Sequence, residues 1–183
     1  MSHDQHQSAA RFFYAIVPDP AAARSLERTG QEVARTCGGR ALAARDLHLT
    51  IAFVGNRPLS DSRLLLPPAL ALPGELLARD DWPATRIERL ASFGRGIVWA
   101  GPEQTPPWLA ELALTIRAAL RAAGIGFDEK PLRPHVTLVR GAQRWGRTDP
   151  PPEFAPVQVA SWRLALGWSG EGHAGARYRW HTL

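Results

Sequence analysis

The sequence predicts a fold of mixed strands and helices in which one structural unit occurs twice. The segment His48-Leu49-Thr50-Ile51 has a close counterpart in His135-Val136-Thr137-Leu138. A strand pattern and a helix pattern precede each segment, and the strand starts lie 36 and 38 residues before the respective histidine. A chain of 183 residues suits one domain or two small lobes that share a core. A repeated unit related by an approximate two-fold axis would bring the two histidine segments together across a groove.

The first half opens with a strand predicted at residues 11–17, where aromatic and aliphatic side chains form a continuous run. A helix is predicted over residues 20–35, because Asp19 is a suitable N-cap and Pro20 suits the first helical position. Residues 47–54 then predict the strand that carries the first histidine.

The middle of the chain has weaker signals. Gly55-Asn56 predicts a turn that closes the first histidine strand. Prolines and a glycine interrupt residues 60–83, so we expect broken helical turns there rather than one long helix. Residues 85–93 and 97–100 predict two further strands, joined by a glycine-rich turn.

The second half contains the clearest helix of the chain, at residues 106–123, where apolar residues recur at helical spacing. Residues 135–139 predict the second histidine strand, and the polar, proline-rich residues 141–153 predict a loop. Residues 157–166 and 177–181 predict a closing pair of strands.

The composition favours an anionic partner without requiring one. Hydrophobic residues make up 45% of the chain, which is enough for a sizeable core. Lys and Arg number 22 against 17 Asp and Glu, for a net charge of +5, and Lys130 is the only lysine. Guanidinium groups suit bidentate contacts to phosphate, so the arginines are consistent with a phosphate-containing substrate. A coding bias toward arginine and alanine explains the same composition equally well.

The sequence predicts a soluble, cytoplasmic protein that does not act at a membrane. Cys37 is the only cysteine, so an intrachain disulfide and a cysteine-based zinc site are excluded. No apolar run approaches the roughly 18 residues of a membrane helix, and the polar N-terminus does not resemble a signal peptide. We expect residues 1–10 to form a disordered tail and residues 11–183 to form a single domain of two intertwined lobes.

The chemistry of the chain concentrates in the two His-x-Thr segments. Side chains alternate between the faces of a strand, so His48 and Thr50 share one face, and His135 and Thr137 do the same. Two imidazoles can supply an acid and a base near neutral pH, and two hydroxyls can donate hydrogen bonds to phosphate oxygens. One such motif alone would more often be a core or exposed histidine, and the threonines would also serve as strand residues. The recurrence in matching places favours a shared site.

A metal site is not expected, because no carboxylate lies at ligand spacing near either motif and two histidines make a poor structural zinc site. We therefore predict chemistry without a metal or any other cofactor.

Three stretches resemble the successive signatures of one family: Phe12-Phe13-Tyr14-Ala15-Ile16, His48-Leu49-Thr50-Ile51-Ala52-Phe53-Val54-Gly55 and Arg133-Pro134-His135-Val136-Thr137-Leu138-Val139-Arg140. The family is the bacterial and archaeal RNA 2′,3′-cyclic phosphodiesterases, also called 2′-5′ RNA ligases, of the two-histidine (2H) phosphoesterase superfamily. The resemblance covers nearly the whole chain after the tail, including Gly94-Arg95-Gly96 and Gly175-Ala176-Arg177-Tyr178. The chain departs from it at Gly167-Trp168-Ser169, where relatives tend to have an aromatic and an acidic residue before the serine, and in the proline-broken segment after Ser60.

The resemblance implies an α+β fold with a bilobal, pseudo-two-fold duplication, in which two antiparallel sheets face each other across a central groove with helices outside. It also implies hydrolysis of a 2′,3′-cyclic phosphate to a 2′-phosphate at RNA 3′ ends or on oligonucleotides. By this analogy His135 is the base, His48 is the acid that protonates O3′, and Thr50, Thr137 and Arg140 bind the phosphate.

Arg140 matches the arginine that follows the second motif in the family. Strict strand alternation would direct it away from His135 and Thr137, so it reaches the phosphate only if the strand bends or ends there.

Four further residues are candidates for substrate contact. Arg133 precedes the second motif, and the aromatic residues Phe13, Phe53 and Trp108 could stack on a base. The competing role is solvation for Arg133 and core packing for the aromatics, Trp108 above all because it lies on the apolar face of a predicted helix.

Three functions stay open at this level. The first is a phosphodiesterase acting on RNA ends, and the second is a relative that acts on small cyclic nucleotides or as a 2′-5′ ligase. The third is a basic RNA-binding module without turnover, which the presence of both histidines and both threonines disfavours. For the oligomeric state we expect a monomer.

Overall fold

The computed structural model describes residues 9–67, 70–79, 82–148, 152–169 and 177–183. They form an α+β fold with a large antiparallel sheet and a second, two-stranded sheet. The large sheet has the strand order β10-β9-β1-β3-β7-β6-β5, and β2 also pairs with β7. Its strands are β1 (Ala9–Pro18), β2 (Arg40–Ala41), β3 (Leu49–Pro58), β5 (Arg89–Ser92), β6 (Val98–Gly101), β7 (Val136–Arg140), β9 (Trp162–Ser169) and β10 (Arg179–Thr182).

The helices and the small sheet complete the fold. The helices are α1 (Pro20–Cys37), α2 (Gly74–Leu77) and α3 (Pro107–Ala122), with 3₁₀ turns at Ala44–Asp46 and Leu59–Leu65. The small sheet pairs β4 (Thr85–Ile87) with β8 (Val157–Val159). The two long helices and the broken turns between β3 and β4 are therefore close to the sequence prediction.

The two halves of the chain meet in the middle of the large sheet. Strands β3 and β7, which follow the two histidines, pair antiparallel at Leu49 and Val136. This pairing makes the sheet continuous, which differs from the prediction of two separate sheets that face each other. The α+β class and the antiparallel arrangement are confirmed.

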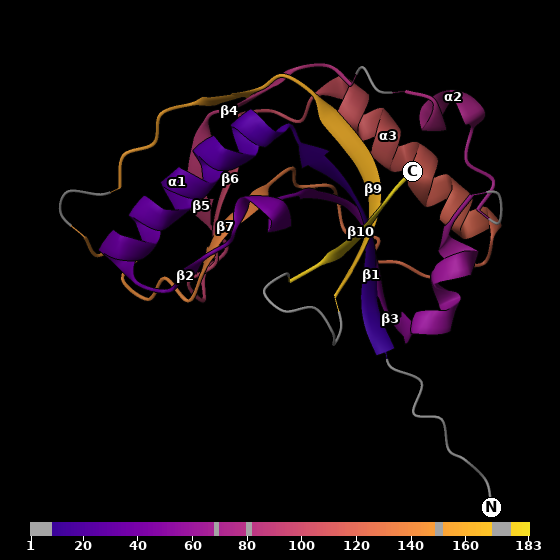
Figure 1. The fold of residues 1–183 in the computed structure, drawn as a ribbon, viewed down its shortest axis with the longest axis horizontal. Helices are drawn as coiled ribbons and strands as arrows, with labels where there is room; N and C mark the ends of the chain where they lie inside the picture. Colours follow the sequence, from indigo (N-terminus) through magenta and orange to yellow (C-terminus); the bar gives the residue numbers. More distant parts are fainter. Residues whose placement is uncertain (1–8, 68–69, 80–81, 149–151, 170–176) are drawn as a thin grey trace, which may run out of the picture.

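Each long helix packs against the histidine strand of the other half. The two helices lie on opposite sides of the molecule, α1 on the left and α3 on the right in Figure 1. Helix α1 follows β1 but contacts β7 and β2, whereas α3 follows β6 and contacts β3. Helix α1 approaches β7 closely at Gly30, where an added Cβ would lie 3.1 Å from the carbonyl oxygen of Leu138. The apolar residues between these layers are buried, among them Leu49, Ile51, Val136 and Leu138.

Asp19 follows β1 and accepts hydrogen bonds both from the start of α1 and from the chain between β8 and β9. Its Oδ1 accepts hydrogen bonds from the backbone N–H groups of Ala21 and Ala22, which confirms the predicted N-cap of α1. Its Oδ2 accepts the N–H of Ala160 at 2.9 Å, between β8 and β9. The chain predicted as one strand over residues 157–166 is therefore divided into two strands at this point.

Three other boundaries differ from the prediction. Strand β1 begins at Ala9, within the predicted tail, of which residues 1–8 lie outside the described part. Strand β3 continues through the predicted turn, because Gly55 takes a φ of +92° at a bulge opposite Phe12 and Phe13. The strand predicted at residues 85–93 is two strands that belong to different sheets.

Within the described ranges, no helix combines the length and the apolar character needed to cross a membrane.

Candidate active site

The two His-x-Thr motifs lie side by side on one face of the sheet. Each histidine directly precedes its strand, and the residue after it forms the Leu49–Val136 pair. Continuing this antiparallel register by one residue places His48 opposite Thr137 and Thr50 opposite His135. Diagonal neighbours in such a pair lie roughly 7–8 Å apart, which suits two imidazoles around one phosphate. The burial pattern confirms the predicted alternation, with Leu49 and Val136 fully buried and the histidines and threonines half-buried.

Both imidazoles are held in the same way. Nδ1 of His48 donates to the carbonyl oxygen of Asp46 at 2.8 Å, and Nδ1 of His135 donates to that of Arg133 at 2.6 Å. A carbonyl oxygen only accepts, so in the neutral ring the proton sits on Nδ1 and Nε2 is unprotonated. The two rings thus present the same nitrogen for chemistry.

Matching bulges turn a third residue in each strand toward this face. Opposite β1, the register of β3 skips Ile51, and opposite β6 the register of β7 skips Leu138. Each skipped residue is the third after its histidine, so the alternation is shifted by one and two consecutive residues are buried. Phe53 and Arg140, each five residues after a histidine, are thereby returned to the face of Thr50 and Thr137. For Arg140 this removes the objection that strict alternation raised.

Aromatic side chains enclose His48. The ring of Phe13 stacks on it at 4.8 Å, and the rings of Tyr178 and Trp180 contact it edge-on at 4.9 and 5.2 Å. Gly167 lies opposite both Phe13 and Trp180 in the neighbouring strands. A Cβ added there would lie 2.6 Å from each ring, so the missing side chain makes room for the two rings against His48.

Asp46 ties the C-terminal part of the chain to His48. The residue is 5% exposed, and its Oδ1 accepts hydrogen bonds from the backbone N–H groups of Arg177 and Tyr178 at 3.1 and 3.3 Å. Since its carbonyl oxygen also holds His48, one residue orients the imidazole and positions Tyr178 beside it. The indole N–H of Trp180 donates to the carbonyl of Arg45 at 3.2 Å and fastens the same segment.

His135 has a more open environment. Phe93 contacts it edge-on at 4.7 Å and stacks on Trp99 at 5.1 Å. With Thr50 and Phe53, His135 lines a cavity of about 440 Å³, within the range of small-molecule pockets. Phe53 is 41% exposed and Phe93, which lines the same cavity, is 43% exposed. The His135 side therefore offers exposed aromatic surface next to the predicted phosphate site.

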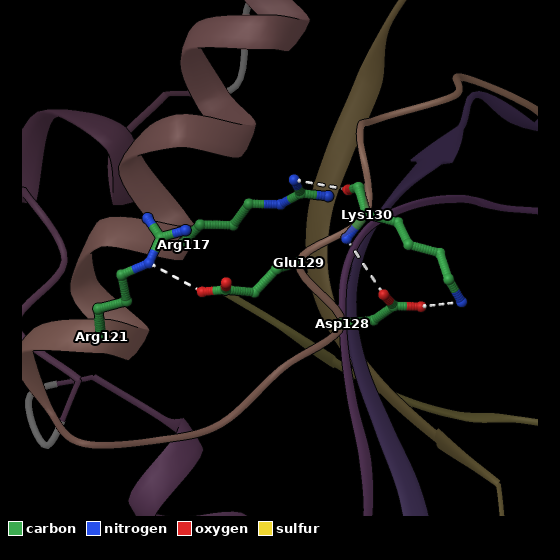
Figure 2. A network of polar contacts seen from close by, with 5 residues as sticks. All are labelled: Arg117, Arg121, Asp128, Glu129 and Lys130. Carbon is green, nitrogen blue, oxygen red and sulfur yellow. Dashed lines mark hydrogen bonds and ion pairs between the residues drawn. The ribbon is translucent and has the colours of Figure 1, made fainter.

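Three residues of a polar network line this cavity, namely Arg117, Asp128 and Lys130, and Figure 2 shows the contacts of the network. Arg117 reaches from α3 and donates to the carbonyl oxygens of Lys130 and Ile51, at 3.0 and 3.3 Å. Lys130 pairs with Asp128 at 3.1 Å, and Arg121 pairs with Glu129 at the same distance. Arg117 thus joins α3 to the segment before the second motif and to β3 beside Thr50.

Burial lowers the pKa of both histidines. Desolvation is the largest effect on His48 and, with positive charge on His135 and Arg140, lowers its pKa to about 4, although the hydrogen bond that His48 donates to the Asp46 carbonyl raises it. The pKa of His135 is also lowered, by burial first and then by Arg140. The two imidazoles and Arg140 are therefore close enough to interact electrostatically.

The remaining candidates fall into two groups. Arg133 is exposed beside His135 and lines the 440 Å³ cavity, as Phe53 does. Phe13, by contrast, is only 4% exposed and supports His48, so its ring offers no open face to a base. Trp108 packs against Trp82 and the core, the role that the sequence favoured.

Sequence reasoning missed several residues at this site. They are Asp46, Phe93, Trp99, Arg117, Tyr178 and Trp180. Only Asp46 had a usable signal, because it precedes its histidine by two residues, as Arg133 does. In the described part of the chain, no group of three or more His, Cys, Asp or Glu side chains could hold a metal ion.

Sequence comparison finds curated relatives of one kind. The chain is 31% identical over 174 residues to the RNA 2′,3′-cyclic phosphodiesterase of Thermus thermophilus, and the match covers 90% of this chain and 79% of that protein. It is 35% identical over 121 residues to the RNA 2′,3′-cyclic phosphodiesterase of Escherichia coli. That match covers 63% of this chain and 62% of the relative, so it spans less than two thirds of the E. coli protein. No family model matches the sequence.

Solved structures agree with this similarity. E. coli LigT complexed with 3′-AMP superposes with a TM-score of 0.66 at 26% identity, covering 96% of this chain and 95% of that one. LigT complexed with NADP+ gives a TM-score of 0.64 at 27% identity with the same coverage. The fold of TT0787 of Thermus thermophilus is also similar, with a TM-score of 0.62 at 23% identity over 94% of both chains. The extent of the Thermus sequence match, together with these folds, shows that the chain belongs to the RNA 2′,3′-cyclic phosphodiesterase family.

Proposed function

We propose that this protein hydrolyses the 2′,3′-cyclic phosphate at RNA 3′ ends to a 2′-phosphate, with His48 and His135 as its catalytic pair. The pairing of Leu49 with Val136 carries the proposal, because it sets both His-x-Thr motifs around one position. A single motif is a common strand pattern, whereas two adjacent ones supply an acid, a base and two hydroxyl donors for one phosphorus centre. The names of the relatives support the same reaction.

The reaction needs two proton transfers at opposite sides of the phosphorus. One imidazole takes a proton from water through Nε2 as the water oxygen bonds to phosphorus. The bond from phosphorus to O3′ breaks, and the other imidazole gives O3′ its proton, so the product is a 2′-phosphate with a free 3′-hydroxyl. The Nδ1 hydrogen bonds to Asp46 and Arg133 support this scheme, since they fix the tautomer that leaves Nε2 available in the neutral ring.

Which histidine acts as the acid stays a prediction. The family analogy assigns the acid to His48 and the base to His135. The pKa of about 4 for His48 runs against that order, because an imidazole with this pKa is mostly neutral near pH 7. A bound phosphate anion raises the pKa of both rings, so the order is set in the substrate complex.

Thr50, Thr137 and Arg140 would bind the phosphate oxygens. Arg140 lowers the pKa of both histidines, so its positive charge lies near each of them. Its Nε is buried and has no hydrogen-bond partner among the described residues. A phosphate oxygen would satisfy this donor and spread the negative charge of the transition state.

The nucleoside that carries the cyclic phosphate would occupy the 440 Å³ cavity. This cavity touches Thr50 and His135 directly and presents Phe53 for base stacking and Arg133 for a polar or stacking contact. Three positive side chains against one carboxylate line it, which suits a nucleotide.

We also propose an approximate two-fold relation between the halves, and three repeated features support it. The Nδ1–carbonyl bonds, the bulges three residues after each histidine and the exchanged helix contacts all occur twice. A monomer acting in the cytoplasm stays the expected biological form.

The test is hydrolysis of a short RNA that ends in a 2′,3′-cyclic phosphate, in buffer with EDTA, with the product identified by ³¹P NMR. We expect the 2′-phosphate alone, formed at the same rate with and without EDTA. A 3′-phosphate product would overturn the assigned bond cleavage, loss of turnover in EDTA would overturn metal-free chemistry, and binding without turnover would leave an RNA-binding module.

A further inference from the structure

A second cavity adjoins the proposed nucleoside site. Its volume is about 340 Å³, and it shares Phe93, Leu132, Arg133 and His135 with the first cavity. Its own lining includes Arg89, Trp99 and Glu103. The two cavities therefore meet at His135 and Phe93, one on the β3 side and the other on the β5–β6 side.

The lining of the second cavity suits a nucleotide. Trp99 and Phe93 form a stacked aromatic pair, 5.1 Å between ring centroids, and the guanidinium of Arg89 lies 5.8 Å from the Trp99 ring. Sequence-tolerant binding of single-stranded nucleic acid combines such rings with cationic side chains that follow the backbone. Arg89 and Arg133 provide the positive charge here.

Arg89 is available for a phosphate. Its ion pair with Glu103 is 3.8 Å long, and the side chains are 48% and 67% exposed. An exposed pair of this kind contributes little to stability, so a phosphodiester oxygen can replace the carboxylate at small cost.

The opposite flank of the site is closed. Phe13, Tyr178 and Trp180 cover His48, and Asp46 holds the segment that carries Tyr178 and Trp180 in place. A chain of nucleotides that ends at the two histidines therefore finds its open, cationic and aromatic surface on the His135 side.

We infer that the second cavity binds the nucleotide preceding the one with the cyclic phosphate, with its base on the Phe93–Trp99 pair and its linking phosphate near Arg89. This rests on the proposed function and makes RNA ends, rather than cyclic mononucleotides, the preferred substrate class.

Three substrates test the inference with the full chain. They are 2′,3′-cyclic AMP, the dinucleotide ApA with a 2′,3′-cyclic phosphate, and the same dinucleotide without its first base. We expect kcat/KM for the dinucleotide to exceed that for cyclic AMP, and removal of the first base to lower it by roughly 5- to 150-fold, the range for one stacked base.

Two arginine variants test the phosphate contact. Arg89→Gln should lower kcat/KM for the dinucleotide by roughly 2- to 10-fold and change cyclic AMP hydrolysis far less. It should also make kcat/KM for the dinucleotide less sensitive to salt, because an exposed charge–charge contact that salt screens is lost. Arg86→Gln is the matched control, because Arg86 also forms an exposed 3.8 Å ion pair, with Glu88, but does not line this cavity.

Two kinds of result would contradict these expectations, one for the second cavity and one for the proposed function. Equal kcat/KM for cyclic AMP and the dinucleotide would overturn the second cavity while leaving the proposed function intact. The second cavity would also be overturned if Lys130→Gln abolished the preference for the dinucleotide and Arg89→Gln did not, because Lys130 lines only the first cavity. If the protein hydrolyses none of the three substrates, the proposed function itself is overturned.

Discussion

The surroundings of His48 and His135 differ although the two motifs are held alike. Both imidazoles donate Nδ1–H to the carbonyl two residues before them, and both strands bulge three residues after them. Outside these shared features, His48 is enclosed by Phe13 of β1 and by Tyr178 and Trp180, whose segment is held by Asp46. His135 instead borders two open cavities.

This difference fits the proposed reaction on an asymmetric substrate. The imidazoles would occur on both sides because that reaction needs a proton transfer on each side of the phosphorus. The flanks would differ because only one side has to accept a nucleoside and a chain. The residues that follow the two bulges differ as well. Phe53 in the first half lines the open cavity, whereas Arg140 in the second half lies near both histidines.

Loss of either imidazole should have the largest effect. We expect His48→Ala and His135→Ala each to lower kcat on cyclic-phosphate RNA by roughly 10²- to 10⁴-fold, because each removes one of the two proton transfers. His181→Ala is the control, since this histidine lies exposed on β10. A variant of either motif that keeps near wild-type kcat with an intact fold would remove that residue from the catalytic pair.

A better leaving group should distinguish the two histidines. A substrate with sulfur in place of O3′ needs no proton on its leaving atom, so the variant that lacks the acid should recover much of its activity. By the family analogy we expect recovery of about 10²-fold for His48→Ala and little for His135→Ala, measured as kcat relative to wild type on each substrate. Recovery by His135→Ala alone would reverse the two roles.

Release of the C-terminal segment should affect only the enclosed flank. Asp46→Ala removes the acceptor of two backbone N–H groups, so we expect a loss of about 1–3 kcal/mol in unfolding free energy and roughly 10- to 100-fold in kcat as His48 loses its support. Asp46→Asn keeps an oxygen acceptor and should retain most of the unfolding free energy and most of kcat. If the Ala and Asn variants have equal kcat, the contact does not position His48.

Acid should destabilise the protein through the same enclosed histidine. The pKa of His48 is about 4 in the folded protein against about 6.5 when exposed, so the unfolded chain binds more protons between these values. Stability should therefore fall as the pH is lowered from about 6.5 to about 4, by at most about 1.4 kcal/mol per pH unit from this group. His135 acts in the same direction.

Urea unfolding of wild type and His48→Gln at pH 7 and pH 4.5 measures this effect. We expect a smaller acid-induced loss in the variant. An equal loss in both proteins would show that His48 is not the group responsible.

Local patterns in the sequence predicted most of the elements that hold the site. Asp19 and Pro20 predicted the start of α1, and the helical spacing of apolar residues predicted α3. Strand alternation predicted that each histidine shares a face with its threonine. The bulges at Ile51 and Leu138 could not be predicted, because they arise from the register with β1 and β6, which are distant in sequence. The contact of Asp46 with Tyr178 spans 132 residues and leaves no local trace. The exposure of Phe93 depends likewise on its packing against Trp99.

The absence of a side chain at Gly167 restricts which substitutions the packing around His48 can accept. Because Phe13 and Trp180 fill the space above that residue and contact His48, a single methyl group there would displace the His48 ring. We therefore expect the packing of the site to accept side-chain changes more readily on the rim of the two cavities, where Phe53 and Arg89 are exposed, than behind His48.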